Sequence, residues 1–195
     1  MQALFKISYG LYVLTARTNK FNGCIINTLS QVQSAPTRVS ITVNKDNYTT
    51  KMIEETGVFN VSIINEKADF SLFERFGFSS GKTTQKFTGF TAFKMSKNGL
   101  PYITENTNAF ISCKVVSKTE LDTHICFIAE ITEEQVLNDI NSLTYDEYFK
   151  SVKPKPESKG KWTCKICNYT YDGEVLPEDY ICPICKHGKE FFIKK

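Results

Sequence analysis

Two Cys-x-x-Cys pairs near the carboxyl end restrict what this chain can fold into more than any other feature of its sequence. The pairs are Cys164 with Cys167 and Cys182 with Cys185. Two residues between the cysteines of a pair allow both sulfurs to face one ion, and two such pairs form a tetrahedral site of four thiolates. The spacing predicts a bound metal, and zinc and iron both suit such a site. So short a tail normally needs a metal, a disulfide or a partner to fold, because it buries too little apolar surface by itself. A bound metal explains how this tail folds.

The composition predicts a protein of the cytoplasm. The chain has seven cysteines, an odd number, and its start lacks the basic-then-apolar pattern of a signal peptide, which argues against a disulfide framework. No apolar run approaches the roughly 20 residues that cross a bilayer, so we expect no membrane partner. The formal charge is only +3, and no basic stripe carries interleaved aromatic residues. Nucleic acid is therefore excluded as an expected partner.

A polar segment with alternating Lys and Pro divides the chain at residues 151–160. This composition favours an extended spacer over a floppy coil. We therefore predict a first domain at residues 1–150, a linker at 151–160 and a C-terminal module at 161–195.

The first domain is predicted to be mainly β, a closed barrel or a sandwich with few helices. Residues 38–43 alternate apolar and polar side chains, as a half-buried strand does. Asn22-Gly23 is a hairpin-turn signal, and Asn47 and Gly57 suit the two ends of a helix. Further strands are expected at 11–16, 24–32, 59–64, 109–118 and 125–132, and further helices at 67–76 and 144–150.

The C-terminal module resembles rubredoxin over the whole of residues 161–195. Besides the cysteines, the residues that carry the resemblance are Trp162, Tyr169, Tyr171-Asp172-Gly173, Leu176-Pro177-Glu178-Asp179, Pro183 and Phe191. The resemblance implies one iron bound by Cys164, Cys167, Cys182 and Cys185. It also implies a small aromatic core of Trp162, Tyr171, Tyr180 and Phe191. The loop between the cysteine pairs is shorter than in free rubredoxins, as in rubredoxin-like domains that occur in fusions.

Residues 44–50 lie where a strand is expected to end and a helix to begin. A helix start offers unpaired N–H groups and the positive end of the helix dipole, Lys45 adds a charge, and Thr49 adds a hydroxyl. This combination suits a phosphate group. An ordinary helix cap is the alternative interpretation, and the residues themselves do not decide between the two.

The first domain resembles the FMN-binding split-barrel family of flavin reductases and flavoredoxins. The stretches that carry the resemblance are 4–15, 22–28, 40–45, 74–78, 80–82, 86–87 and 123–130. The resemblance implies an FMN-binding split β-barrel with a few helices, and a homodimer with the flavin near the subunit interface. It implies that Asn27, Thr28, Leu29, Ser30 and Gln31 line the isoalloxazine. It also implies that Asn44, Lys45, Asn47 and Thr49 hold the ribityl chain and phosphate.

Two further residues are candidates through the same resemblance. Lys82 follows a glycine in an expected turn and is a candidate for binding phosphate or the nicotinamide cofactor, with a solvated surface residue as the alternative. His124 is a candidate catalytic residue at the flavin edge, with a core histidine as the alternative. Cys24, Cys113 and Cys126 are interpreted as inert core thiols.

The fusion as a whole resembles the high-molecular-weight rubredoxins of anaerobes. Such proteins pass electrons from NAD(P)H through FMN to iron and on to a redox partner such as a flavodiiron reductase of nitric oxide or oxygen. Three alternatives stay open: a flavin reductase that supplies free reduced flavin, a flavin domain reduced only by another protein, and a zinc-ribbon binding module on a ligand-binding barrel. The chain has no Gly-x-Gly-x-x-Gly fingerprint, so the sequence does not distinguish NADH from NADPH.

Overall fold

The computed structural model describes residues 6–154, 161–166, 169–183 and 187–194. The chain forms two compact units, Met1–Val152 and Lys153–Lys195. Cys167 and Cys185, two of the four predicted metal ligands, lie outside the described residues, as do residues 155–160 of the predicted linker. In the part of the chain that is described, no helix has the length and apolarity to cross a bilayer.

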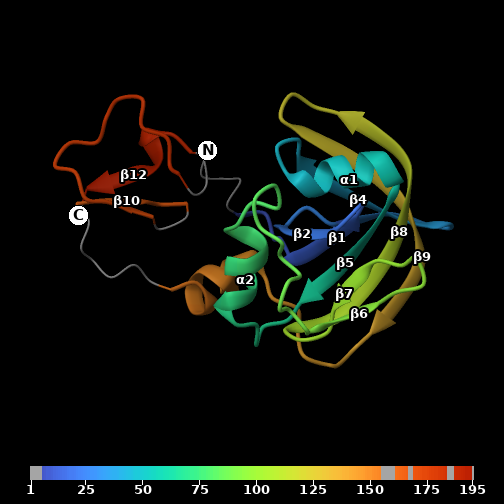
Figure 1. Ribbon diagram of the computed structural model, residues 1–195. Coiled ribbons are helices and arrows are strands. Elements are labelled where there is room, and N and C mark those ends of the chain that lie inside the picture. The colour runs from blue at the N-terminus through green and yellow to red at the C-terminus, as the bar shows by residue number, and fades with distance from the viewer. Residues whose placement is uncertain (1–5, 155–160, 167–168, 184–186, 195) are drawn as a thin grey trace. The chain divides into compact units, whose positions relative to one another are not determined.

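A seven-stranded antiparallel sheet dominates the first unit, which confirms the predicted mainly-β fold (Figure 1). The strand order is β2-β1-β5-β8-β9-β4-β3. The strands are β1 (Tyr12–Arg17), β2 (Phe21–Ile26), β3 (Ser30–Ser34), β4 (Thr37–Asn44), β5 (Val58–Ile64), β8 (Thr107–Glu120) and β9 (His124–Val136). A separate two-stranded ribbon pairs β6 (Phe93–Met95) with β7 (Pro101–Ile103).

The connection between the two edge strands forces the sheet to curl. Strands β2 and β3 lie at opposite ends of the strand order, yet only residues 27–29 join them. So short a connection spans about 14 Å at most, so one end of each edge strand must come close to the other. A hydrogen bond of 2.6 Å from the Thr28 hydroxyl to the Thr42 carbonyl holds this connection against β4. The curled sheet is consistent with a split barrel.

The inside of the curled sheet is apolar because alternate residues of each strand point inward. Strand β4 shows the alternation clearly, with Val39, Ile41 and Val43 all buried. Phe59 and Phe127 are fully buried in the same cluster.

Helix α1 (Tyr48–Thr56) contributes Met52 and Ile53 to this cluster. It ends as the sequence predicts. Gly57 adopts a left-handed conformation with φ of 69°, and its N–H donates to the carbonyl of Ile53 at 2.8 Å.

A second apolar cluster is centred on helix α2 (Phe70–Gly77), which contributes Phe73 and Phe76. The short helix α3 (Tyr145–Glu147) and the π-helix Tyr148–Val152 close the unit, and Tyr148 packs on Phe73 with ring centroids 4.5 Å apart.

Two local predictions were wrong, and one element was missed. The expected strand at 24–32 is interrupted at residues 27–29, where the chain passes from one sheet edge to the other. Asn22-Gly23 forms no turn: the chain reverses at residues 18–20, and both residues lie buried in β2. Gly23 is needed there because an added Cβ would lie 3.0 Å from the Phe76 ring. The β6–β7 ribbon was not predicted, because its strands are only three residues long.

The second unit is a three-stranded sheet in the order β11-β10-β12. Its strands are β10 (Trp162–Cys164), β11 (Thr170–Tyr171) and β12 (Phe192–Lys194). A 3-10 helix at Lys189–Phe191 leads into the last strand.

Candidate functional site

Two of the four predicted metal ligands, Cys164 and Cys182, lie in the described part of the chain. Both are fully buried, and they belong to one apolar cluster with Leu176 and Phe192. The two cysteines are also presented in the same way. The N–H of Cys164 donates to the carbonyl of Tyr169 at 2.8 Å, and the N–H of Cys182 donates to the carbonyl of His187 at 2.8 Å. Each cysteine therefore opens a loop closed five residues later, and that loop contains the second cysteine of its pair.

The surroundings of these two thiols suit a tetrathiolate metal. Sulfur donors, a dry cluster and two equivalent loops are what such a centre requires. Three of the four aromatic residues predicted around the iron, Trp162, Tyr171 and Tyr180, pack against the cluster. The fourth position is taken by Phe192, while Phe191 packs on the His187 ring at 4.8 Å.

The predicted isoalloxazine residues, Asn27 to Gln31, lie on the connection between β2 and β3 and at the start of β3. Leu29 packs against the main core, and Thr28 is bound to Thr42. Ser30 and Gln31 are exposed on the edge strand. In a single chain, the backbone N–H and C=O groups along the outer edge of this strand are therefore accessible to a bound group.

The predicted phosphate segment surrounds the start of α1. Asn47 occupies the N-cap position, its side chain makes no capping hydrogen bond, and no acidic residue lies in the first turn. The Asn44 carbonyl accepts from the Asn47 N–H at 3.1 Å and from the Thr50 hydroxyl at 2.7 Å. The helix start is thus held firmly, and its electrostatics suit an anion.

The structure brings Asn44, Lys45 and His124 together. Asn44 lies directly opposite His124 in the β4–β9 pair, and the Lys45 N–H donates to the Thr123 carbonyl at 3.0 Å. The Nδ1 of His124, which is half-buried, lies 2.8 Å from the Thr123 hydroxyl. The Lys45 ammonium lies 3.5 Å from the Glu120 carboxylate.

Asn22 is a residue of this region that sequence reasoning missed. It is 2% exposed, and its side-chain amide donates to the Thr49 hydroxyl at 2.8 Å. A Cβ added to Gly81 would lie 2.3 Å from the Asn22 Oδ1, so the 80–82 turn lies directly against this side chain. Asn22 thereby links Thr49 to the turn that carries Lys82, and Lys82 itself is exposed. The sequence did not indicate this role of Asn22, because Asn-Gly is a typical turn sequence.

These features fit FMN. The start of α1 and Lys45 suit a phosphate. Within the described part of the chain, the buried Asn22 Oδ1 has no hydrogen-bond partner. A hydroxyl of a ribityl chain is the kind of donor that such an acceptor lacks.

Beneath this region lies a buried lysine. The ammonium of Lys86 donates to the carbonyls of Gly23 and Phe76 at 2.8 and 2.9 Å. Burial lowers the pKa of Lys86, and the nearby Cys24 opposes the change. Burial raises the pKa of Cys24, opposed by the Thr49 hydroxyl and Lys86. Burial also raises the pKa of Cys113, to about 12. Cys24 and Cys113 are therefore poor nucleophiles.

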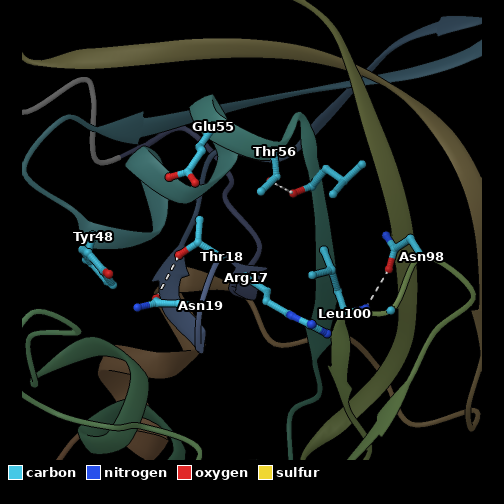
Figure 2. A pocket seen from close by; sticks show the side chains of 10 residues that line it. Arg17, Thr18, Asn19, Tyr48, Glu55, Thr56, Asn98 and Leu100 are labelled. Carbon is cyan, nitrogen blue, oxygen red and sulfur yellow. Dashed lines mark hydrogen bonds between the residues drawn. The ribbon is translucent and has the colours of Figure 1, made fainter.

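Two cavities flank the turn between β1 and β2, and Arg17 and Asn19 line both. One has a volume of about 860 Å³ (Figure 2). It is lined by Arg17, Thr18, Asn19, Tyr48, Glu55, Thr56, Val58, Asn98, Gly99 and Leu100. The other has a volume of about 480 Å³ and is lined by Arg17, Asn19, Lys20, Phe21, Gln85, Phe87 and Thr88. None of the predicted flavin residues lines either cavity.

Comparison with known proteins matches each part of the chain to a family. Residues 4–152 match the flavin reductase like domain, and residues 162–193 match the rubrerythrin, rubredoxin-like domain. A high molecular weight rubredoxin of Moorella thermoacetica is 33% identical, over 98% of this chain and 97% of its own length. A ferric-chelate reductase (NAD(P)H) of Archaeoglobus fulgidus is 36% identical, over 80% of this chain and 92% of its own length.

The fold also has solved counterparts. The crystal structure of a flavoredoxin from Methanosarcina acetivorans superposes with a TM-score of 0.60 at 24% identity. The match covers 66% of this chain and 69% of the flavoredoxin. The predicted architecture, a flavin reductase-like domain followed by a rubredoxin-like domain, is confirmed by the matched families.

Proposed function

Because the chain belongs to the flavin reductase-like family and carries a rubredoxin-like domain at its C-terminal end, we propose that it is an electron-transfer flavoprotein. In this proposal electrons pass from NAD(P)H through FMN to one iron held by Cys164, Cys167, Cys182 and Cys185. The observation that carries the proposal is the pair of buried, equivalently presented cysteines at the end of a flavin reductase-like chain.

FMN supplies, when bound, the conversion of a two-electron donation into single-electron steps, and a tetrathiolate iron carries one electron at a time. The chain's own residues provide binding and electrostatics. The start of α1, Lys45 and Asn47 hold the phosphate, with Asn44 beside them. Thr49, which is fully buried, positions the first turn of α1 through its bond to Asn22. Lys82 is a second cation for a phosphate.

Residues Asn27, Thr28, Leu29, Ser30 and Gln31 line the isoalloxazine in this proposal, and His124 lies at its edge as a proton donor. Ser30 and Gln31 are exposed in a single chain, so one chain leaves the isoalloxazine open on this side. This exposure supports the proposal of a homodimer, in which the second copy covers the flavin.

The electron acceptor is proposed to be another redox protein, such as a flavodiiron protein in the cytoplasm. The resemblance of the fused domains to high-molecular-weight rubredoxins supports this partner. The Archaeoglobus relative carries NAD(P)H in its name, which supports a nicotinamide donor.

Metal and flavin analysis of the purified full chain tests the proposal. We expect one iron and one flavin per chain, with ferric-thiolate absorption bands that dithionite bleaches. Anaerobic mixing with NADH or NADPH is expected to bleach the flavin first and the iron bands second. Stoichiometric zinc without iron would refute the electron-transfer role and favour the zinc-ribbon alternative. If neither NADH nor NADPH bleached the flavin, direct reduction by a nicotinamide nucleotide would be excluded, and the electron donor would be another protein.

A second function is favoured by one observation. The Archaeoglobus relative is named a ferric-chelate reductase and matches 80% of this chain, so a flavin reductase-like domain without most of the tail has an activity of its own. The first domain could by the same logic supply reduced flavin to other acceptors. Retention of FMN through gel filtration, at one flavin per chain, would contradict that function.

A further inference from the structure

The larger cavity beside the β1–β2 turn has no role in the proposed flavin site or metal centre. Its volume of about 860 Å³ is within the range of small-molecule sites, which is roughly 300–1,000 Å³. Its walls come from the end of β1, both ends of α1, the start of β5 and the turn between β6 and β7.

Three side chains give the cavity its chemistry. Tyr48 and Glu55 are seven residues apart on α1, so two helical turns place them on the same face. Figure 2 shows both side chains at the cavity, with Arg17 reaching in from the end of β1. Within the described part of the chain, neither Arg17 nor Glu55 forms an ion pair. A cation, a carboxylate and an aromatic ring are thus presented together without neutralising one another.

The wall opposite α1 is rigid. The Asn98 side chain donates to the Asn60 Oδ1 at 2.8 Å and accepts from the Ser96 hydroxyl at 2.7 Å and the Leu100 N–H at 3.0 Å. Gly99 has a φ of 76°, which this tight turn requires. Asn98 is therefore fully engaged in shaping the cavity. The Arg17 guanidinium packs over the Phe21 ring, 5.4 Å from its centroid, and this contact leaves its N–H donors for an anion.

A second cation lies beside the same ring. The Lys20 ammonium lies 5.0 Å from the centroid of the Tyr48 ring and donates to the Gly81 carbonyl at 3.0 Å. Lys20 and Arg17 together line the adjoining smaller cavity. Positive charge therefore concentrates around the β1–β2 turn, where the two cavities share Arg17 and Asn19.

We propose that the larger cavity binds the adenosine diphosphate portion of NADH. The adenine ring contacts Tyr48, the ribose hydroxyls donate to Glu55, and the diphosphate lies against Arg17 with Lys20 nearby. A planar ring, hydroxyl donors and an anion are the three features that this set of side chains complements. The assignment rests on the proposed function, because it takes the nicotinamide donor from there.

The carboxylate of Glu55 makes the cavity selective. An acidic side chain beside the adenosine ribose accepts from its 2′-hydroxyl in NADH and repels the 2′-phosphate of NADPH. We therefore assign NADH as the preferred donor, a distinction that no sequence fingerprint provides.

Titration calorimetry of the full chain with ADP, which cannot donate a hydride, tests the site directly. Arg17→Gln is expected to weaken ADP binding about tenfold, the loss of one charge-assisted contact, and the weakening should shrink as salt is added. Tyr48→Leu is expected to weaken ADP binding, and Tyr48→Phe, which keeps the ring, to leave it near wild type. The matched control is Lys94→Gln, which removes an exposed cation of β6 that lines neither cavity.

Selectivity is tested with 2′,5′-ADP, which carries the extra phosphate. The wild type is expected to prefer ADP, and Glu55→Gln to reduce that preference about tenfold. ADP affinity unchanged in both Arg17→Gln and Tyr48→Leu would overturn the assignment.

Failure of this site and failure of the proposed function are distinguishable. Flavin bleaching by NADH that is insensitive to Arg17→Gln and Tyr48→Leu would refute the site and leave the proposed function standing. Arg17-dependent ADP binding without bleaching by NADH would refute the proposed donor and leave the nucleotide site supported.

Discussion

The side-chain amide of Asn22 donates a 2.8 Å hydrogen bond to the hydroxyl of Thr49 and so joins β2 to the first turn of α1. Both residues are buried, 2% and 0% exposed, so water cannot replace the bond. The start of α1, which the proposed phosphate site requires, is therefore positioned by a strand 27 residues away in the sequence.

Thr49→Val is expected to destabilise the first unit by about 1–3 kcal/mol, because it leaves the buried Asn22 amide without an acceptor. A double-mutant cycle with Asn22→Ala should give a coupling of about 0.5–3 kcal/mol. Urea unfolding followed by circular dichroism measures both. Thr37→Val is the control: its hydroxyl bonds to Ser34 at the exposed end of β4, and we expect a change within about 0.5 kcal/mol. Additive effects of the two core substitutions would contradict the coupling.

Gly81→Ala is expected to destabilise the first unit by about 1–3 kcal/mol, because the new Cβ would overlap the Asn22 side chain. The midpoint of urea unfolding reports the loss. Gly77→Ala, at the end of α2, serves as its partner experiment, since a Cβ there would lie 3.3 Å from the Cγ1 of Ile25, a much looser contact than the one at Gly81. We expect the Gly77 variant to keep the wild-type midpoint, and equal losses in both variants would rule out the contact with Asn22 as the cause.

Lys86→Met is expected to lower stability at pH 7 by about 1–3 kcal/mol, because the carbonyls of Gly23 and Phe76 lose their donor. The difference from wild type should also depend on pH. Burial lowers the pKa of Lys86 below its ordinary value of 10.5, so between these two pKa values the unfolded chain binds more protons than the folded one. Stability of the wild type therefore rises with pH in that window, and the variant lacks this contribution.

The measurement is urea unfolding of both proteins at several pH values up to 10.5. Lys86 opposes the raised pKa of Cys24, so its removal also changes the titration of that thiol. Both proteins are therefore compared in a Cys24→Ala background, in which Lys86 is the only difference. If the difference in unfolding free energy between wild type and Lys86→Met narrowed as the pH rises, Lys86 would not be held with a lowered pKa.

Cys164→Ser or Cys182→Ser is expected to abolish metal binding and to unfold the second unit, while the first unit keeps its fold. Both cysteines are buried, and the unit has only a small apolar cluster to hold it without metal. Metal content and limited proteolysis measure the two effects. The control is Cys126→Ser. Cys126 is a half-buried residue of β9 in the first unit, so this variant should retain the metal. Protease resistance of residues 161–195 in the metal-free variants would show that the unit folds unaided.

Local sequence patterns determined much of the fold. The alternation at residues 38–43 predicted a strand, and β4 (Thr37–Asn44) contains it. Gly57 predicted the end of α1, because the left-handed backbone conformation that ends the helix favours glycine over any other residue. The spacing of the cysteines predicted the metal centre for the same kind of reason, since two residues between thiols fix their geometry within one loop. Among the described ligands, Cys164 and Cys182 lie buried in one cluster, as that prediction requires.

Only the tertiary structure decided how distant segments meet. Asn22-Gly23 carries the local signal of a turn, yet Phe76 of α2 needs the space above Gly23, and the pair lies in a strand. The same arrangement creates the Asn22–Thr49 bond, the burial of Lys86, and the cavity that Arg17 shares with Tyr48 and Glu55. Turn and cap preferences act over a few residues and amount to about 1 kcal/mol or less, whereas burial of a large side chain is worth more. Contacts between segments far apart in the sequence therefore override the local preference wherever the two conflict.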